Sequence, residues 1–129
     1  SDIMEIITRY EIDGIIISNT TNANREKLLD IKKNEEGGLS GKPLKSISTE
    51  MIKKFYKESN KKISIIGVGG VDSGQSAFEK IVSGASVVQL YTGMVYKGPS
   101  IVKEIKKELI SILNREGIKN IKEAVGIKA

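Results

Sequence analysis

The chain has 129 residues, of which 39% are hydrophobic and 29% charged, and a net charge of +5 at pH 7. This length suits one domain with a hydrophobic core, or part of one. The sequence contains no cysteine and no histidine, which excludes a disulfide, a Cys/His zinc site, a thiolate nucleophile and a Ser-His-Asp triad from these residues. Acid–base chemistry is left to Lys, Tyr, Asp, Glu or a hydroxyl group.

The positive charge is spread along the chain rather than gathered in one patch. Lys103, Lys106 and Lys107, for example, alternate with Glu104 and Glu108. Lysines interleaved with acidic residues are typical of solvated helix faces, so the composition argues against nucleic acid as a partner. No apolar run reaches the roughly 18 residues of a membrane span, and the chain does not open with a signal-like segment.

The first predicted element is an amphipathic helix over residues 2–11. Its apolar residues Ile3, Ile6, Ile7 and Tyr10 recur with helical spacing, so we expect this face to pack on a core. The chain starts at Ser1 without an initiator Met, and no strand precedes this helix. We therefore expect the chain to be a piece of a longer protein.

Ile15, Ile16 and Ile17 predict a buried parallel strand, because all three are β-branched and no polar residue alternates with them. The strand is followed by Ser18, Asn19, Thr20 and Thr21. In α/β folds ligands bind at the carboxyl ends of such strands. These side chains either contact a ligand or merely end the strand and cap a turn.

Residues 22–46 show no sustained periodicity and include the string EGGLSGKPL. A connection of this length is often functional in a compact domain. Gly37, Gly38 and Gly41 would let the backbone approach a ligand, and Ser40 adds a hydroxyl group. The alternative interpretation is a mobile surface loop.

The strand expected at the centre of the fold lies in Ile63–Gly74, which reads ISIIGVGGVDSG. Its apolar run indicates a strand covered on both faces. Gly67, Gly69 and Gly70 remove side chains at the strand's end, and Asp72 or Ser73 can cap the following helix. The pattern fits either anion binding by free backbone N–H groups and a helix N-terminus or a plain tight turn.

Further elements surround this strand. Ser48 is a plausible N-cap for a helix that ends near Asn60, and a short helix over residues 77–82 precedes Gly84. SVVQL at 86–90 predicts a third strand with the exit Tyr91–Thr92–Gly93. Pro99 suits the first turn of a long helix that ends before Gly117, and Asn120 with Glu123 resembles a capping box for a last short helix.

Strands that alternate with helices predict an α/β fold with a parallel sheet. Three strands are too few for a stable open sheet, and a complete (β/α)8 barrel takes about 250 residues. We therefore expect about half of a TIM barrel, in a single domain over residues 1–129. The exits GVGG and YTG resemble the phosphate-binding loops after strands 7 and 8 of such barrels, which assigns strands 6–8 to this chain.

Several strings together resemble the carboxyl-terminal half of class 2 dihydroorotate dehydrogenases: DGIIISNTT, GGLSGKPL, Ser48–Thr49, SIIGVGGVDSG, GASVVQLYTG and Gly98–Pro99. They occur in that family's order and spacing and span nearly the whole chain. The resemblance implies an FMN-containing (β/α)8 barrel that oxidises dihydroorotate to orotate in pyrimidine biosynthesis and passes the electrons to a quinone.

The resemblance also implies roles for individual residues. Asn19 and Thr20 would hydrogen-bond the pyrimidine ring, which fits the donor and acceptor that an Asn amide offers in one plane. Ser18 would lie beside the flavin and Leu90 in the same region. The remaining FMN contacts would be Ser40, Gly41, Gly69, Gly70, Tyr91 and Thr92, with the glycine and Tyr91–Thr92 backbone amides around the phosphate.

The family's catalytic serine, a flavin-contacting lysine and further substrate asparagines match no segment of this chain, so we expect them in an amino-terminal half of the barrel. The family's quinone-binding amino-terminal helices would make the peripheral membrane contact. The implied location is the cytoplasmic face of the inner membrane in bacteria or the mitochondrial inner membrane in eukaryotes. Two alternatives remain: another FMN- or phosphate-binding barrel enzyme, and a basic nucleic-acid-binding domain.

Overall fold

The computed structural model describes residues 2–23 and 25–129. Its helices and strands are α1 (Asp2–Arg9), β1 (Gly14–Ile17), α2 (Lys45–Glu58), β2 (Ser64–Val68), α3 (Gly74–Val82), β3 (Val87–Gln89), α4 (Thr92–Lys97), α5 (Ile101–Arg115) and α6 (Ile121–Ala124), with short 3-10 turns at Arg25–Lys27 and Lys42–Leu44. The predicted order of elements is found, with α4 added. Six residues are too few to show helical periodicity, so the sequence did not reveal α4.

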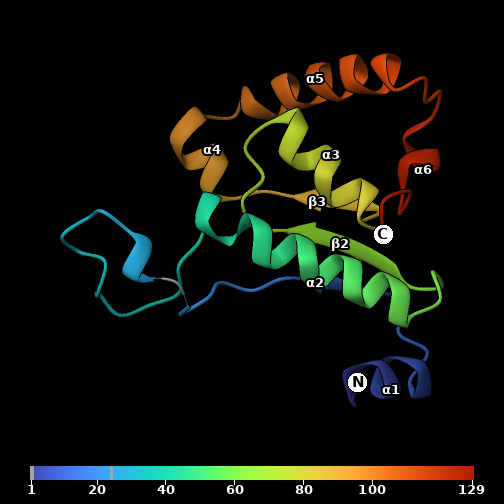
Figure 1. The fold of residues 1–129 in the computed structure, drawn as a ribbon, viewed down its shortest axis with the longest axis horizontal. Helices are drawn as coiled ribbons and strands as arrows, with labels where there is room; N and C mark the ends of the chain where they lie inside the picture. Colours follow the sequence, from blue (N-terminus) through green and yellow to red (C-terminus); the bar gives the residue numbers. More distant parts are fainter. Residues whose placement is uncertain (1, 24) are drawn as a thin grey trace.

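The three strands form one parallel sheet in the order β1-β2-β3. In this register Ile15 pairs with Ile65, and Gly67 pairs with both Ile17 and Val88. Strand β2 is therefore central, as the sequence predicted. Figure 1 shows α2 running beside β2, with α5 packed across α3. The carboxyl ends of all three strands consequently open on the same edge of the sheet.

Among the described residues, helices cover one face of the sheet and leave the other open, which corrects the expectation that the strands are buried on both faces. Ile17 and Ile65 on the helix side are 4% and 0% exposed, whereas Ile16 and Val87 on the other side are 62% and 57% exposed. Successive residues of a strand point to opposite faces, and α2 and α3 lie against one of them. The uncovered face is the one that would point into a barrel.

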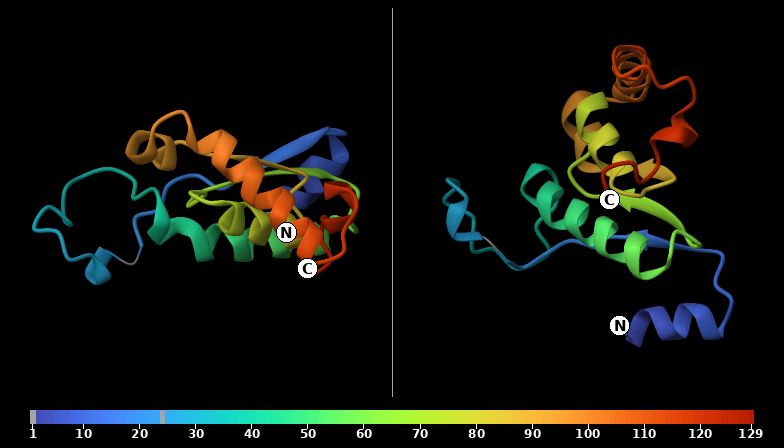
Figure 2. Two further views of the ribbon diagram at one scale, coloured as in Figure 1. Left: turned by 90° about the horizontal axis from the view of Figure 1, so that it is seen from above. Right: turned by 45° about the vertical axis from the view of Figure 1, so that its right-hand side comes forward.

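Helix α1 also differs from the prediction. Of its expected core residues only Ile7 is buried, while Ile3, Ile6 and Tyr10 are more than half exposed. The helix stands apart from the other helices at one end of the sheet (Figure 2), and only part of its surface reaches the core around α2 and β2. Amphipathic spacing predicted the helix itself but not how much of its apolar face is covered.

Helix α2 begins at Lys45, directly after a 3-10 turn that contains Pro43. Ser48 is therefore not the predicted N-cap, because it lies within the helix and is completely buried. Its side chain hydrogen-bonds the end of β2 instead of a free amide of α2. Placing the helix start at Ser48 was wrong because the turn that precedes the helix already has helical backbone angles.

Ser73 and Asn120 cap α3 and α6 as predicted, although Asn120 bonds to Lys122 rather than forming the expected capping box with Glu123, and Pro99 lies just before α5 instead of in its first turn. Ser73 caps α3 in a reciprocal capping box with Ser76, and Asn120 caps α6 by accepting a hydrogen bond from the Lys122 amide at 3.0 Å. Gly84 follows α3 with φ +122°. Within residues 2–23 and 25–129, no helix combines the length and apolarity that crossing a membrane requires.

Gly84 offers a test of the core. A Cβ atom at this position would lie 2.4 Å from Cγ of Tyr56, and the backbone is in the left-handed region. We expect Gly84→Ala to lower the free energy of unfolding by about 2 kcal/mol or more, since strain and overpacking add. Gly117→Ala is the matched control: its φ is +70° but nothing lies within 4 Å, so it should cost only about 1 kcal/mol. Urea unfolding measures both, and equal losses would contradict the packing argument.

Candidate functional site

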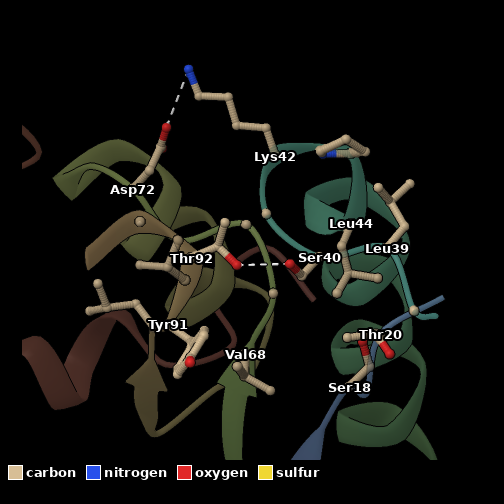
Figure 3. Close-up of a pocket in the computed structure, with 18 of the residues that line it drawn as sticks. Ser18, Thr20, Leu39, Ser40, Lys42, Leu44, Val68, Asp72, Tyr91 and Thr92 are labelled. Carbon is tan, nitrogen blue, oxygen red and sulfur yellow. Dashed lines mark hydrogen bonds and ion pairs between the residues drawn. The ribbon is translucent and has the colours of Figure 1, made fainter. Parts of the chain in front are cut away.

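A cavity of about 770 Å³ lies at the carboxyl ends of the three strands. Its wall includes every site residue predicted from the sequence: Ser18, Asn19, Thr20, Ser40, Gly41, Gly69, Gly70, Leu90, Tyr91 and Thr92. These residues come from four separate segments of the chain, which Figure 3 shows converging on one space. The fold brings all ten together.

The carbonyl oxygen of Val68 joins the ends of β1 and β2. It accepts a hydrogen bond from the Ser18 amide at 3.3 Å and a second one from the Ser48 hydroxyl group of α2. Because a carbonyl oxygen has two lone pairs, it can accept both bonds. Ser18 is thereby held beside the glycines that follow β2.

The connection after β1 returns to the cavity through a short antiparallel bridge. Thr21 and Leu39 exchange backbone hydrogen bonds of 3.1 and 2.7 Å. Gly38 fits here because it has no side chain: a Cβ atom would lie 1.8 Å from Oγ1 of Thr20. The bridge carries Ser40 to the exit of β3, where its hydroxyl accepts a hydrogen bond of 2.9 Å from Thr92 (Figure 3).

Gly69 and Gly70 form a close backbone turn with φ of +107° and +72°. A Cβ atom at Gly70 would lie 2.6 Å from Cβ of Lys45 and 2.9 Å from its backbone nitrogen. The exit of β2 is therefore pressed against the start of α2. Among the described residues, the amides of Gly69 and Gly70 have no hydrogen-bond acceptor, which leaves them available to an anion.

The first turn of α3 does not offer the free N–H groups that the sequence suggested. The amides of Asp72 and Ser73 both donate to Oγ of Ser76, at 2.9 and 3.0 Å. The Gly74 amide donates to the Glu108 carboxylate of α5. The capping box and Glu108 thus already occupy the amides of Asp72, Ser73, Gly74 and Ser76, which leaves the loops as the main source of free donors facing the cavity.

Sequence reasoning missed several residues of the cavity wall, among them two lysines. Nζ of Lys42 lies 3.4 Å from the Asp72 carboxylate, and Nζ of Lys97 donates to the Asp72 carbonyl at 2.8 Å. Lys42 stands in the quoted string GGLSGKPL and could have been found there. Lys97 is placed by α4, which had no signal in the sequence. The Asp72 carboxylate offsets one of these two charges, so the three side chains together give the cavity wall a net charge of +1.

Asn19 and Thr20 are exposed in the cavity wall. Oδ1 of Asn19 accepts a hydrogen bond of 2.8 Å from the Thr20 amide. This bond holds the Asn19 side chain against its own backbone and leaves its NH2 group for another acceptor. The side chain is thus oriented by a local contact rather than by packing.

A buried lysine lies behind the cavity. Lys80 of α3 is completely buried, and its Nζ donates to Oγ of Ser48 at 3.0 Å and to Oγ1 of Thr49 at 3.2 Å. Burial lowers the pKa of Lys80 to about 8; the charge of Glu79 opposes this shift and that of Lys45 reinforces it. We expected lysines on solvated helix faces, so this buried lysine was not predicted from the sequence.

A sequence profile described as dihydroorotate dehydrogenase matches residues 1–113. The chain belongs to this family. Dihydroorotate dehydrogenase (quinone) from Natronomonas pharaonis is 44% identical over 126 residues, covering 98% of this chain and 35% of the relative. Dihydroorotate dehydrogenase (quinone), mitochondrial, from Mus musculus is 45% identical over 126 residues. The match covers 98% of this chain and 32% of the mouse protein.

The structural comparison agrees with this family. A crystal structure of ligand-free type DHODH from Eimeria tenella matches with a TM-score of 0.95 at 42% identity, covering 98% of this chain and 35% of that one. The predicted α/β fold with a parallel sheet is confirmed, and the partial coverage agrees with part of a barrel. The chain spans about a third of the length of these dihydroorotate dehydrogenases.

Lys80 makes stability depend on pH. The folded protein releases the Lys80 proton near pH 8, whereas the unfolded chain keeps it to about 10.5. Between these values the unfolded state binds more protons, so the free energy of unfolding should rise by about 1.4 kcal/mol per pH unit relative to Lys80→Met. Below pH 8 the free energy of unfolding should change with pH in the same way in the wild type and in Lys80→Met, so that the two curves run parallel. Urea unfolding from pH 7 to 10 measures the difference, and curves that stay parallel throughout would contradict the prediction.

Proposed function

We propose that residues 1–129 form the FMN phosphate site and part of the dihydroorotate site of a quinone-dependent dihydroorotate dehydrogenase. The observation that carries this proposal is the meeting of SNTT, GGLSG, GVGG and YTG around one cavity at the carboxyl ends of parallel strands. Ligands of α/β enzymes bind at this edge of the sheet.

The glycine loops suit a phosphate. Gly41, Gly69 and Gly70 have positive φ, and a Cβ at Gly70 would overlap α2, so the backbone is bare where an anion would approach. The unpaired amides of Gly69 and Gly70, with Tyr91 and Thr92 across the cavity, would hold the FMN phosphate. Lys42 and Lys97 would add positive charge beside it. Ser18, Ser40 and Leu90 would contact the rest of the cofactor.

Asn19 and Thr20 would bind the substrate ring. A pyrimidine ring alternates hydrogen-bond donors and acceptors, and an amide beside a hydroxyl offers both kinds of partner. The chemistry that FMN supplies when bound is acceptance of a hydride from dihydroorotate and delivery of the electrons to a quinone. We assign the base that removes the substrate proton to a serine outside residues 1–129.

The proposal extends to where the enzyme acts. A quinone acceptor is dissolved in lipid, so the longer protein would work at a membrane surface: the cytoplasmic face of the inner membrane in bacteria, or the mitochondrial inner membrane in eukaryotes. The names of the relatives from Mus musculus and Arabidopsis thaliana, which include "mitochondrial", support such a location.

The substrate part of the proposal is tested by Asn19→Ala in the full-length enzyme. We expect the variant to retain FMN but to lose roughly 5- to 150-fold in kcat/KM for dihydroorotate, because polar groups of the substrate are left unpaired at about 1–3 kcal/mol. Asn34→Ala, an exposed residue of the same connection outside the cavity, is the matched control. Dihydroorotate-dependent dye reduction measures both. Near-normal kcat/KM in Asn19→Ala would exclude this role.

The cofactor part is tested by Gly70→Val. The new side chain would collide with the start of α2 and block the approach of a phosphate, so we expect purified protein without flavin. Gly117→Val carries a similar backbone penalty in open space and should stay yellow. The ratio of flavin to protein absorbance gives the occupancy. Full occupancy in Gly70→Val would show that the phosphate site lies elsewhere.

A further inference from the structure

The buried ammonium group of Lys80 has a specific set of partners outside the cavity. Its side chain runs under β2, where a Cβ atom at Gly67 would lie 3.3 Å from Cδ of Lys80. The ammonium group then donates to Ser48 and Thr49 of α2 at 3.0 and 3.2 Å. Burying a lysine without a carboxylate contact is costly, and nothing in packing a helix on a sheet requires one.

The first contact leads to the exits of β1 and β2. Ser48 receives a hydrogen bond from Lys80 and donates its own proton to the Val68 carbonyl, which also accepts from the Ser18 amide. A hydroxyl group that accepts from a cation is a stronger donor, because hydrogen bonds in series polarise one another. The ammonium group therefore strengthens the bond that holds the end of β2.

The second contact leads to the glycine turn. Thr49 accepts from Lys80 and donates to the Lys45 carbonyl at 2.8 Å. Lys45 is the residue against which Gly70 packs. The two hydroxyl groups thus connect one buried cation to both sides of the Gly69–Gly70 backbone.

We propose that Lys80 is a positioning residue that holds the exits of β1 and β2 in the geometry that binds the cofactor phosphate. It acts through Ser48 and Thr49 and touches neither cofactor nor substrate. This inference rests on the proposed function, since it concerns the same FMN site.

The charge of Lys80 should then matter to FMN binding. The charged groups near it are Glu79 of its own helix and Lys45 of α2, which pair with each other at 3.0 Å. Its neighbours Ser48, Thr49, Ile52 and Ala85 carry no charge. Above pH 8 the neutral amine can accept the Ser48 proton, which releases the Val68 carbonyl. FMN should therefore bind more weakly as pH rises through about 8.

The test compares full-length wild type with Lys80→Met, which keeps the apolar part of the side chain and removes the ammonium group. FMN is titrated into apoprotein from pH 7 to 9.5 by quenching of flavin fluorescence. We expect about tenfold weaker binding at pH 7 in Lys80→Met and no inflection near pH 8. Ile81→Val is the matched control, since Ile81 is a buried residue of the same helix that packs in the cluster containing Ile112. It should lower the melting temperature without changing the affinity or its pH profile.

Ser48→Ala keeps the question decidable if Lys80→Met does not fold. It should reproduce the loss of affinity and abolish the inflection near pH 8, because Lys80 reaches the Val68 carbonyl through this hydroxyl group. Where Lys80→Met does fold, the losses of the two single variants should not add in the double variant, because both interrupt this contact. A wild-type pH profile and affinity in the folded variants, or equal effects in Ile81→Val, would overturn the positioning role alone. Failure of the wild-type protein to bind FMN would instead refute the proposed function.

Discussion

The carbonyl of Val68 is the point where two strand exits and one helix are held together. It accepts from the Ser18 amide and from the Ser48 hydroxyl group, so the last residue of β2 sets the position of β1's exit and of α2. A parallel sheet does not by itself hold the loops beyond its strands, since ladder hydrogen bonds end with the strands. Because the Val68 carbonyl accepts two hydrogen bonds, it fixes residues beyond the strand ends, including Ser18 in the cavity wall.

Close packing of neighbouring segments against glycine backbone is the second constraint. Gly70 lies against Lys45, Gly67 against the stem of Lys80, and Gly38 against Thr20. At each place a side chain would fill space that another segment occupies. The glycines therefore shape the cavity in two ways: they leave amides bare and they bring α2 and the Thr21–Leu39 bridge close enough to join its wall. A site for an anion needs both, because bare amides without fixed positions select no ligand geometry.

The uncovered sheet face connects the structure with the family comparison. Ile16 and Val87 point away from α2 and α3 and are more than half exposed, although both are β-branched residues suited to a core. The matching dihydroorotate dehydrogenase structure is about three times longer than this chain, which covers 35% of it. In a closed barrel, residues of this face pack in interior layers with residues from the other strands. The strands were expected to be buried on both sides. Within the described residues only the helix side is covered, because the other strands of a barrel would supply the cover for this face.

The sequence alone determined the α/β order and the parallel sheet, because those signals are local, and its resemblance to dihydroorotate dehydrogenases named ten of the residues that line the cavity. An apolar β-branched run ending in Gly-Gly or Ser-Asn-Thr marks the carboxyl end of a strand, and parallel strands bring such ends to one edge. Whether those ten residues bind FMN and substrate stays a prediction.

Only the tertiary structure decided which face of the sheet is covered, that α4 brings Lys97 to the cavity, and that Ser48 hydrogen-bonds a strand rather than capping a helix. It also placed Lys80 inside the protein, although nothing in its sequence position distinguishes it from the exposed lysines. There it donates to two hydroxyl groups of α2, more than thirty residues earlier in the chain. Such contacts join residues far apart in sequence, and no local pattern of spacing or composition encodes them.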